Sequence, residues 1–379
     1  MSLTTVSDNN KLVRYVQEIN REYVRENLFS PYMGTSLNAI IRLKHELKAG
    51  GQDMNIPLVG KLNGTGVGTG TLVGNEENID NYGMRLRIGW ARNAIATKKS
   101  EQQKSSVDLF GEAKPLLSDW GKERQRDDLL NAFMSLPSET LPSSDDTTVN
   151  GVLYEAATAS QRNTWNSQNS DRVLYGNAVG NYNATHATAL TAVDSTNDTF
   201  TKSSLGLLKR VAKGATPKIR PFKTADGYEW FVAFAGTNAF RDLQVSLETI
   251  NKDARAREGR GMDNNPLFQD GDLLYNGVII REVPEISDFV SDVWTSLKTA
   301  GNSSARVEPV FFCGQQAAVL GWGQMARNTE RKEDDYGFVK GVGVEMAYGV
   351  AKMFKKHTDG TSLKQWGVVT GFFAAAEDA

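Results

Sequence analysis

The sequence of 379 residues contains a single cysteine, Cys313, and no long apolar run. One cysteine cannot close a disulfide within the chain, and its place in the apolar stretch VEPVFFCG predicts a small buried residue. A helix needs ~20 consecutive apolar residues to cross a bilayer. We therefore expect no covalent bridge, no transmembrane helix and no membrane partner. The apolar content of 40% is typical of a globular protein.

The chain also lacks an excess of charge of either sign. Its 43 Lys and Arg residues and 45 Asp and Glu residues leave a net charge of -2. This balance argues against a protein whose main task is to grip nucleic acid through phosphates. The first residues, MSLTTVSDNN, contain no basic segment followed by an apolar one, so we expect no secretory signal and a protein made in the cytoplasm.

Catalytic and metal-binding motifs are absent as well. The sequence has no H-x-x-x-H or C-x-x-C pattern and no G-x-S-x-G elbow. Three histidines are widely separated: His45, His186 and His357. The carboxylate pairs Asp127/Asp128 and Asp334/Asp335 lie in highly charged segments, which favours a solvated surface over acid–base catalysis. We therefore expect no catalytic residue, no metal and no cofactor.

A glycine-rich stretch, NGTGVGTGTLVGNEENIDNYG, begins at Asn63. Four of its glycines alternate with small residues: Gly64, Gly66, Gly68 and Gly70. Neither G-x-G-x-x-G nor G-x-x-x-x-G-K-[ST] fits in any register, so an exposed flexible loop or hairpin tip is favoured over a nucleotide site. Glu76 and Glu77 follow, and a solvated or intersubunit acidic patch is favoured over a cation site.

Alternating apolar and polar residues predict strands on both sides of this loop. Asn38–Leu47 and Met54–Leu62 are expected to form a hairpin or edge ribbon. Tyr82–Ala96 is predicted as one strand with an apolar face and a basic face. The apolar face holds Met84, Leu86, Ile88 and Trp90, and the basic face holds Arg85, Arg87 and Arg92. The basic face needs an acidic partner, for which Glu76 and Glu77 of another copy are the first candidates.

The longest predicted helix is Ser105–Leu136. Ser105 and Asp108 have the spacing of a capping box, and a proline follows Leu136. Pro115 predicts a kink or two helices end to end. Apolar residues recur at helical spacing only near the ends: Leu109, Ala113, Leu116, Leu117, Trp120, Leu129, Leu130, Phe133 and Met134.

The middle of this helix is polar on every side. Arg124 can pair with Asp127 or Asp128, and Glu123 with Arg126, for about 0.2–0.5 kcal/mol each. Such pairs are too weak to hold an isolated helix, so tertiary or subunit packing must hold it. A helix of this length with a polar middle suggests a structural spine.

The remaining segments predict an N-terminal arm and a mixed α/β second half. Asn10–Glu26 is an expected amphipathic helix, and Phe29 and Tyr32 after it are expected to dock on their own body or on a neighbour. In the second half we predict helices at Phe200–Ala215, Ala239–Arg257 and Gln315–Arg327, strands at Tyr228–Ala235, Val307–Gly314 and Gly367–Ala374, helix or strand at Tyr348–Lys356, and a tight turn at Asn276-Gly277.

Several stretches, taken in order, resemble the N4-type major capsid proteins of tailed bacteriophages. The first are SPYMGTSLNAIIRLKHELKAGGQDMNIPLVGKLNGTGVGTGTLVGNEENIDNY and RIGWARNAIATKKSEQQKSSVDLFGEAKPLLSDWGKERQRDDLLNAF. Later stretches are NPLFQDGDLLYNGVIIRE, FFCGQQAAVLGWGQ and DYGFVKGVGVEMAYGVAKMFKKH. The order of these parts is more specific than any single motif, and they extend over nearly the whole chain. Residues 137–199 show the least of the family pattern.

The resemblance implies an α+β chain with the Hong Kong 97-type capsid fold. Residues 1–37 would be the N-terminal arm and 38–99 the extended β-hairpin loop with its flanking strands. Residues 100–150 would hold the spine helix of the peripheral domain, and 151–379 the axial α/β domain with returning peripheral strands. No motif supports carrying over the Lys–Asn crosslink found in some relatives.

The function implied is that of a major capsid protein, a non-enzymatic component of the virion assembled in the host cytoplasm. Copies would form pentamers and hexamers of an icosahedral shell that encloses double-stranded DNA through weak contacts, and scaffold, portal and decoration proteins are left open as partners. The alternatives are a cellular nanocompartment shell of the same fold and a cytoplasmic enzyme. The expected subunit contacts are Phe29, Tyr32, Gly64, Gly66, Gly68, Gly70, Glu76, Glu77, Arg85, Arg87, Arg92 and Trp120.

Overall fold

The computed structural model describes residues 27–45, 51–62, 64–104, 109–224, 227–258, 268–269, 272–331, 336, 338–357 and 359–377. The helix predicted at Asn10–Glu26 and the capping box of Ser105 and Asp108 lie outside these residues. Seven α-helices are described: α1 (Lys99–Lys104), α2 (Leu109–Met134), α3 (Ala159–Gln168), α4 (His186–Thr191), α5 (Lys202–Gly214), α6 (Thr237–Glu258) and α7 (Pro284–Asp292). None of the described helices has the length and apolarity that a membrane span requires.

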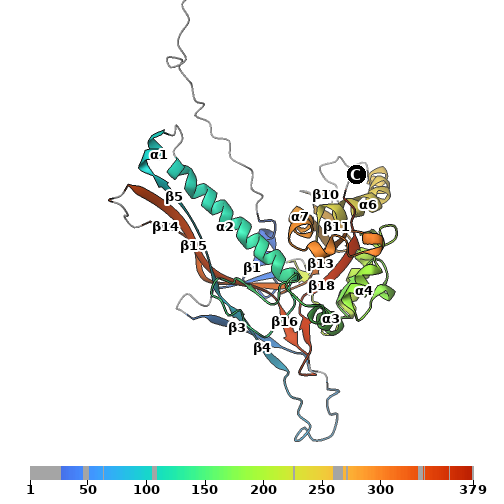
Figure 1. The fold of residues 1–379 in the computed structure, drawn as a ribbon. Coiled ribbons are helices and arrows are strands. Elements are labelled where there is room, and N and C mark those ends of the chain that lie inside the picture. The colour runs from blue at the N-terminus through green and yellow to red at the C-terminus, as the bar shows by residue number, and fades with distance from the viewer. Residues whose placement is uncertain are drawn as a thin grey trace, which may run out of the picture.

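The first sheet is elongated and carries the longest helix. Its hydrogen-bonded order is β1 (Met33–Gly34), β2 (Ile41–Lys44), β14 (Ala318–Glu330), β15 (Val339–Lys352) and β5 (Gly89–Lys98), with β6 (Val149–Asn150) on the last residues of β15. α2 runs along this sheet (Figure 1). It is one helix through Pro115, so the expectation of two helices end to end is wrong. Ala113 and Leu117 pack on Val342 and Val344 of β15, which supplies the tertiary support that the polar helix needs.

A long hairpin packs against the first sheet, and its loop extends away from the body (Figure 1). β3 (Asp53–Val59) pairs with β4 (Asn81–Arg87), and its inward residues Met54, Ile56 and Leu58 are buried. The expected pairing of Asn38–Leu47 with Met54–Leu62 is wrong, because β2 lies parallel to β14 in the first sheet. Alternation identifies a strand and its buried face, but it does not identify the partner strand.

The predicted strand Tyr82–Ala96 is divided at Ile88. β4 belongs to the hairpin, whereas β5 belongs to the first sheet. Gly89 allows the division, because a Cβ there would lie 2.3 Å from the carbonyl oxygen of Thr147. The break also changes the alternation: Ile88 is buried as predicted, but Trp90 is 43% exposed.

The second sheet forms the core of the other half of the chain. Its order is β10 (Phe268–Gln269), β11 (Asp272–Tyr275), β12 (Val278–Glu282), β9 (Glu229–Ala235), β13 (Val307–Cys313), β18 (Val368–Ala374) and β7 (Val173–Tyr175), with β8 (Phe222–Lys223) on β9. The predicted turn between β11 and β12 is confirmed, since Asn276 and Gly277 have φ of 50° and 70°. A small ribbon of β16 (Phe354–Lys356) and β17 (Leu363–Gln365) lies between this sheet and the hairpin.

Helices cover both faces of the second sheet. On β9, Phe231, Ala233 and Ala235 pack in one cluster with apolar residues of α5 and α6. The alternate residues Val232 and Phe234 pack in another cluster with α3, α4, α7 and the end of α2. The helices predicted at Phe200–Ala215 and Ala239–Arg257 and the strands predicted at Tyr228–Ala235, Val307–Gly314 and Gly367–Ala374 are confirmed.

The helix predicted at Gln315–Arg327 is wrong, because this segment is the strand β14. Its apolar start was compatible with a buried helix or a buried strand. Gly321 decides the packing, because a Cβ there would lie 2.7 Å from a methyl group of Leu86 in the hairpin. The segment Tyr348–Lys356, for which helix or strand was predicted, continues β15 and forms β16.

Candidate functional site: the junction and the subunit-contact residues

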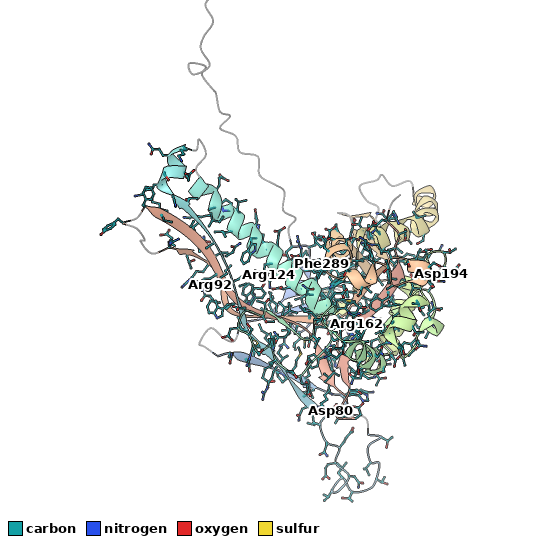
Figure 2. The ribbon with its side chains drawn as sticks, viewed as in Figure 1. Asp80, Arg92, Arg124, Arg162, Asp194 and Phe289 are labelled. Atoms are coloured by element: carbon teal, nitrogen blue, oxygen red, sulfur yellow. The ribbon has the colours of Figure 1, made fainter. Side chains whose placement is uncertain are left out.

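The polar middle of α2 is partly buried against the first sheet. Asp128 is 2% exposed and accepts hydrogen bonds from the hydroxyls of Tyr348 and Thr148, each at 2.6 Å. Arg124 Nε lies 3.2 Å from the same carboxylate, which confirms the predicted Arg124–Asp128 pair (Figure 2 labels Arg124). Burial and the Asp128 carboxylate raise the pKa of Tyr348, so this hydroxyl remains a donor. The interpretation of Asp128 as a solvated surface residue is therefore wrong.

Arg126 connects the same helix to the second half of the chain. Its Nη1 lies 3.2 Å from Glu285 at the start of α7, and both side chains are almost fully buried. The predicted contact with Glu123 is present at 3.9 Å. A buried arginine paired with a buried carboxylate fixes the relative position of the two elements that carry them.

Phe29 docks on its own subunit. Its ring is fully buried and lies 5.8 Å from the ring of Phe133 at the end of α2 and 4.9 Å from Phe234 of β9. Tyr32 is half-buried, and its ring lies 5.4 Å from Phe234. This segment was expected to dock either on its own body or on a neighbouring copy. For Phe29, the structure shows docking on its own body.

A buried lysine caps the C-terminal end of α2. Lys352 of β15 is 2% exposed and donates a hydrogen bond of 3.1 Å to the carbonyl oxygen of Phe133. That carbonyl belongs to the last helical turn, where intrahelical donors are missing. Burial lowers the pKa of Lys352 to about 7. The neighbouring Cys313 is fully buried, as predicted, and burial raises the pKa of its thiol.

Because of Lys352, the stability of the subunit is expected to depend on pH. The folded-state pKa of about 7 lies below the ordinary lysine value of 10.5, so the folded state releases the proton first and this contribution to stability rises with pH above 7. Between pH 7 and 8.5, the free energy of unfolding of the wild type should rise by about 1.5 kcal/mol relative to Lys352→Met. Urea denaturation of both proteins measures this difference, and parallel pH curves would contradict it.

The glycine-rich segment is an exposed loop that joins β3 to β4 and extends away from the body (Figure 1). A Cβ on Gly66 or Gly68 would meet nothing within 4 Å, and a Cβ on Gly64 or Gly70 would meet only atoms of the loop itself. The loop exposes several large apolar side chains: Leu62, Val67, Leu72, Val73 and Ile79. The predicted exposed loop is therefore confirmed.

Glu76 and Glu77 bind the backbone of their own loop. Glu77 Oε2 accepts a hydrogen bond of 2.7 Å from the amide of Gly64, and Glu76 Oε2 accepts one of 2.8 Å from the amide of Gly74. At the root of the loop, Asp80 pairs with Lys355 of β16 (Figure 2 labels Asp80), and Tyr82 donates to Glu139 at 3.2 Å. Carboxylates thus make contacts within the loop and at its root.

The arginines predicted on the basic face have different surroundings. Arg85 and Arg92 are exposed, and Arg92 lies beside Glu345 of β15 (Figure 2). Arg87 has partners in its own chain, since its Nε lies 2.9 Å from Asp53 and its Nη1 donates to the carbonyl oxygen of Pro142 at 2.7 Å. Trp120 is partly buried and packs against the first sheet. The structure therefore leaves Arg85 and Arg92 as the two exposed members of the basic face.

His186 is a buried residue of α4. Its ring accepts or donates hydrogen bonds with the hydroxyls of Tyr154 at 2.8 Å and Tyr175 at 2.6 Å. Burial and the nearby Arg162 lower its pKa to about 3, so the ring is neutral. It lies at one wall of a cavity of about 410 Å³ between α3, α4 and residues 296–300. Nothing in the spacing of the sequence indicated this contact, because the two tyrosines are distant from His186 along the chain.

The described residues contain no group of histidine, cysteine and carboxylate side chains arranged to hold a metal ion. Two of their buried polar clusters, around Asp128 and between Arg126 and Glu285, join structural elements. What the geometry provides is a buried junction between two sheets, packed around the end of α2, and a long hairpin loop that is exposed.

Solved structures with this architecture come from bacteriophage heads. The capsid of cyanophage Pam1 matches with 35% sequence identity and a TM-score of 0.86 over 100% of both chains. The capsid of Ralstonia phage GP4 matches with 22% identity and a TM-score of 0.70, again over 100% of both chains. The head of Helicobacter pylori bacteriophage KHP40 matches with 14% identity and a TM-score of 0.64, covering 97% of this chain and 96% of the other.

These likenesses define the class: the chain has the mixed α+β fold of a phage capsid protein. A family model described as phage capsid protein matches residues 3–371. The chain therefore belongs to the phage capsid protein family, and it is a structural component of a virion. A search of curated proteins gave no match.

Proposed function

We propose that this chain is a major capsid protein of the N4 type that assembles, through contacts between identical copies, into an icosahedral shell around double-stranded DNA. The single observation that carries this proposal is the resemblance over the full length to the cyanophage Pam1 capsid chain. In this proposal the fold is of the Hong Kong 97 type, and pentamers and hexamers close the shell through interfaces between different surfaces of the same protein.

The parts of the chain are assigned as the sequence predicted. Residues 1–37 are the N-terminal arm, 38–99 the extended loop with its flanking strands, 100–150 the spine helix of the peripheral domain and 151–379 the axial domain with returning peripheral strands. The arrangement of two sheets with α2 along the first supports these assignments. Scaffold, portal and decoration proteins are possible partners of such a shell.

The extended loop supports contacts between copies. Leu72 is 66% and Val73 is 80% exposed in the single subunit. Several large apolar side chains on a short loop are costly in water and are better placed against another protein surface. We propose that a neighbouring copy covers the loop, with Glu76 and Glu77 near Arg85 and Arg92 of that copy.

Deleting Gly64–Thr71 is expected to impair assembly without unfolding the subunit. The deleted residues are exposed and make few contacts with the body, whereas the hairpin core of β3 and β4 is retained. Urea denaturation should therefore give a free energy of unfolding within about 1 kcal/mol of the wild type. Electron microscopy and sedimentation would measure the loss of shells.

A length-matched control separates the effect of the loop's side chains from the effect of the loop's length. Replacing residues 64–71 by eight glycine and serine residues keeps the length but removes Val67. Normal shells from the deleted protein would contradict the proposed role of the loop, whereas shells from the control alone would show that the loop acts through its length.

A further inference from the structure

One surface of this nearly neutral protein is strongly basic. Between Thr199 and Thr224 the sequence contains seven basic residues and no acidic residue: Lys202, Lys209, Arg210, Lys213, Lys218, Arg220 and Lys223. We call these seven residues the α5 basic surface. All of them are exposed except Lys209, which is half-buried.

The fold holds these charges on one side of α5. Leu205, Leu208 and Ala212 of α5 are fully buried against the second sheet. At 100° per residue, Lys202, Lys209 and Lys213 therefore lie together along one flank of the helix, about 90° from the centre of the buried face, and Arg210 lies nearly opposite that face. Ile219, which is 2% exposed, anchors the following loop, so that Lys218 and Arg220 on either side of it point outward.

In the part of the chain that the structure describes, few acidic groups balance these charges. Glu229 lies 3.3 Å from Lys223, and the Asp171 carboxylate accepts the amide of Thr216 and pairs with Lys364 at 3.3 Å. Among the described residues, Arg210, Lys213 and Lys218 have no ion-pair partner. Burial and the positive charge of Lys213 lower the pKa of Lys209, which agrees with a positive potential at this surface.

The composition of the surface distinguishes between two classes of polyanionic partner, acidic proteins and nucleic acids. Protein interfaces are depleted of lysine and enriched in aromatic side chains at their centre. The outward face of α5 has instead lysines, an arginine, serine and Gly206, at which a Cβ would meet nothing within 4 Å. Exposed lysine and arginine without an apolar centre is the pattern of non-specific phosphate contacts.

We propose that the α5 basic surface binds the phosphate backbone of duplex DNA, which places it on the inner side of the shell. This inference rests on the proposed function. α5 is about 20 Å long, and a duplex carries about one charge per 1.7 Å of its axis, so the helix can lie beside several phosphates at once. Contacts of this kind are independent of sequence and weaken steeply with salt.

The first test measures binding of a 30-bp duplex to unassembled subunits by fluorescence anisotropy between 50 and 200 mM NaCl. The wild type should bind with a dissociation constant in the range of roughly 10⁻⁴–10⁻⁶ M at physiological salt. The variant R210Q/K213Q/K218Q should bind at least ~10-fold more weakly at 50 mM, with a salt slope smaller by up to about 2.7. The matched control K98Q/K99Q/K340Q removes three exposed charges from β5, α1 and β15, and should bind as the wild type does.

Three outcomes would overturn the proposal. Equal losses in the test and control variants would show that net charge alone governs binding, and no loss in either would place the contacts elsewhere. Tighter binding of poly-glutamate than of duplex DNA at equal charge, lost in the same variant, would identify an acidic protein as the partner.

The second test asks which side of the shell carries the surface. Cys313 is fully buried, so Lys213→Cys creates one accessible thiol. A maleimide coupled to a large polymer should label this thiol in unassembled subunits and in disrupted shells, but not in intact shells. Labelling of intact shells would overturn the inner placement. Failure of any form of the protein to make shells would instead contradict the proposed function and leave the DNA titration interpretable.

Discussion

Replacing Asp128 by alanine is expected to destabilise the subunit by about 3 kcal/mol, because the change leaves buried donors without an acceptor. The hydroxyls of Tyr348 and Thr148 both donate to this carboxylate at 2.6 Å, and Arg124 pairs with it at 3.2 Å. These partners lie on β15, before β6 and on α2 itself. The loss should appear as a lower midpoint of urea denaturation of unassembled subunits.

Two further variants serve as controls for the loss of stability in Asp128→Ala. Asp128→Asn keeps an acceptor of similar size and should lose less than Asp128→Ala. Asp119→Ala removes a half-buried partner of the exposed Lys122, at 3.4 Å on the same helix, and should cost less than about 1 kcal/mol. If Asp128→Ala were as stable as Asp119→Ala, the buried network would have no structural role.

Replacing Phe133 by alanine is expected to cost about 3–5 kcal/mol, the range for truncating a large buried aromatic residue. The Phe133 ring is fully buried and lies 5.5 Å from the ring of Phe311, 6.0 Å from Phe234 and 5.8 Å from Phe29. These residues come from β13, β9 and the segment before β1. The truncation therefore removes packing between α2, the second sheet and residues 27–34 at once.

The consequence for residues 27–34 can be measured separately. Limited proteolysis should cut near Phe29 faster in Phe133→Ala than in the wild type, because Phe29 loses one of its two aromatic neighbours. Val179→Ala is the control, since Val179 is 54% exposed and its truncation should change neither stability nor cleavage. Unchanged cleavage in Phe133→Ala would show that Phe234 alone holds the segment.

Periodicity predicted which residues are buried better than it predicted which elements meet. The alternation of Met84, Leu86 and Ile88 correctly gave the inner face of β4. The same pattern could not show that β2 pairs with β14, nearly 280 residues later, because strand pairing across such a separation leaves no local signal. The helix predicted at Gln315–Arg327 is wrong for the same reason. The contacts that make this segment a strand come from the hairpin and from β15, which are distant along the chain.

The polar residues of the candidate site were harder still to predict. Asp128 and Arg126 occur in a segment that is polar on every side, which is also the pattern of a solvated helix. The burial of Asp128 and Arg126 becomes apparent only in the folded chain, where Tyr348 contacts Asp128 and Glu285 contacts Arg126. The α5 basic surface corresponds to a run of sequence without acidic residues, which the balanced total charge of the chain does not reveal.

The position of β18 has a consequence for the order in which the protein can be made. β18 lies between β13 and β7, and β7 has no other strand partner in the described part of the chain. The second sheet therefore cannot close until residues 368–374 have been synthesised, although β7 was translated almost 200 residues earlier. Pairings between such distant segments raise the contact order and slow folding. A ribosome-bound chain that lacks these residues therefore cannot complete the second sheet.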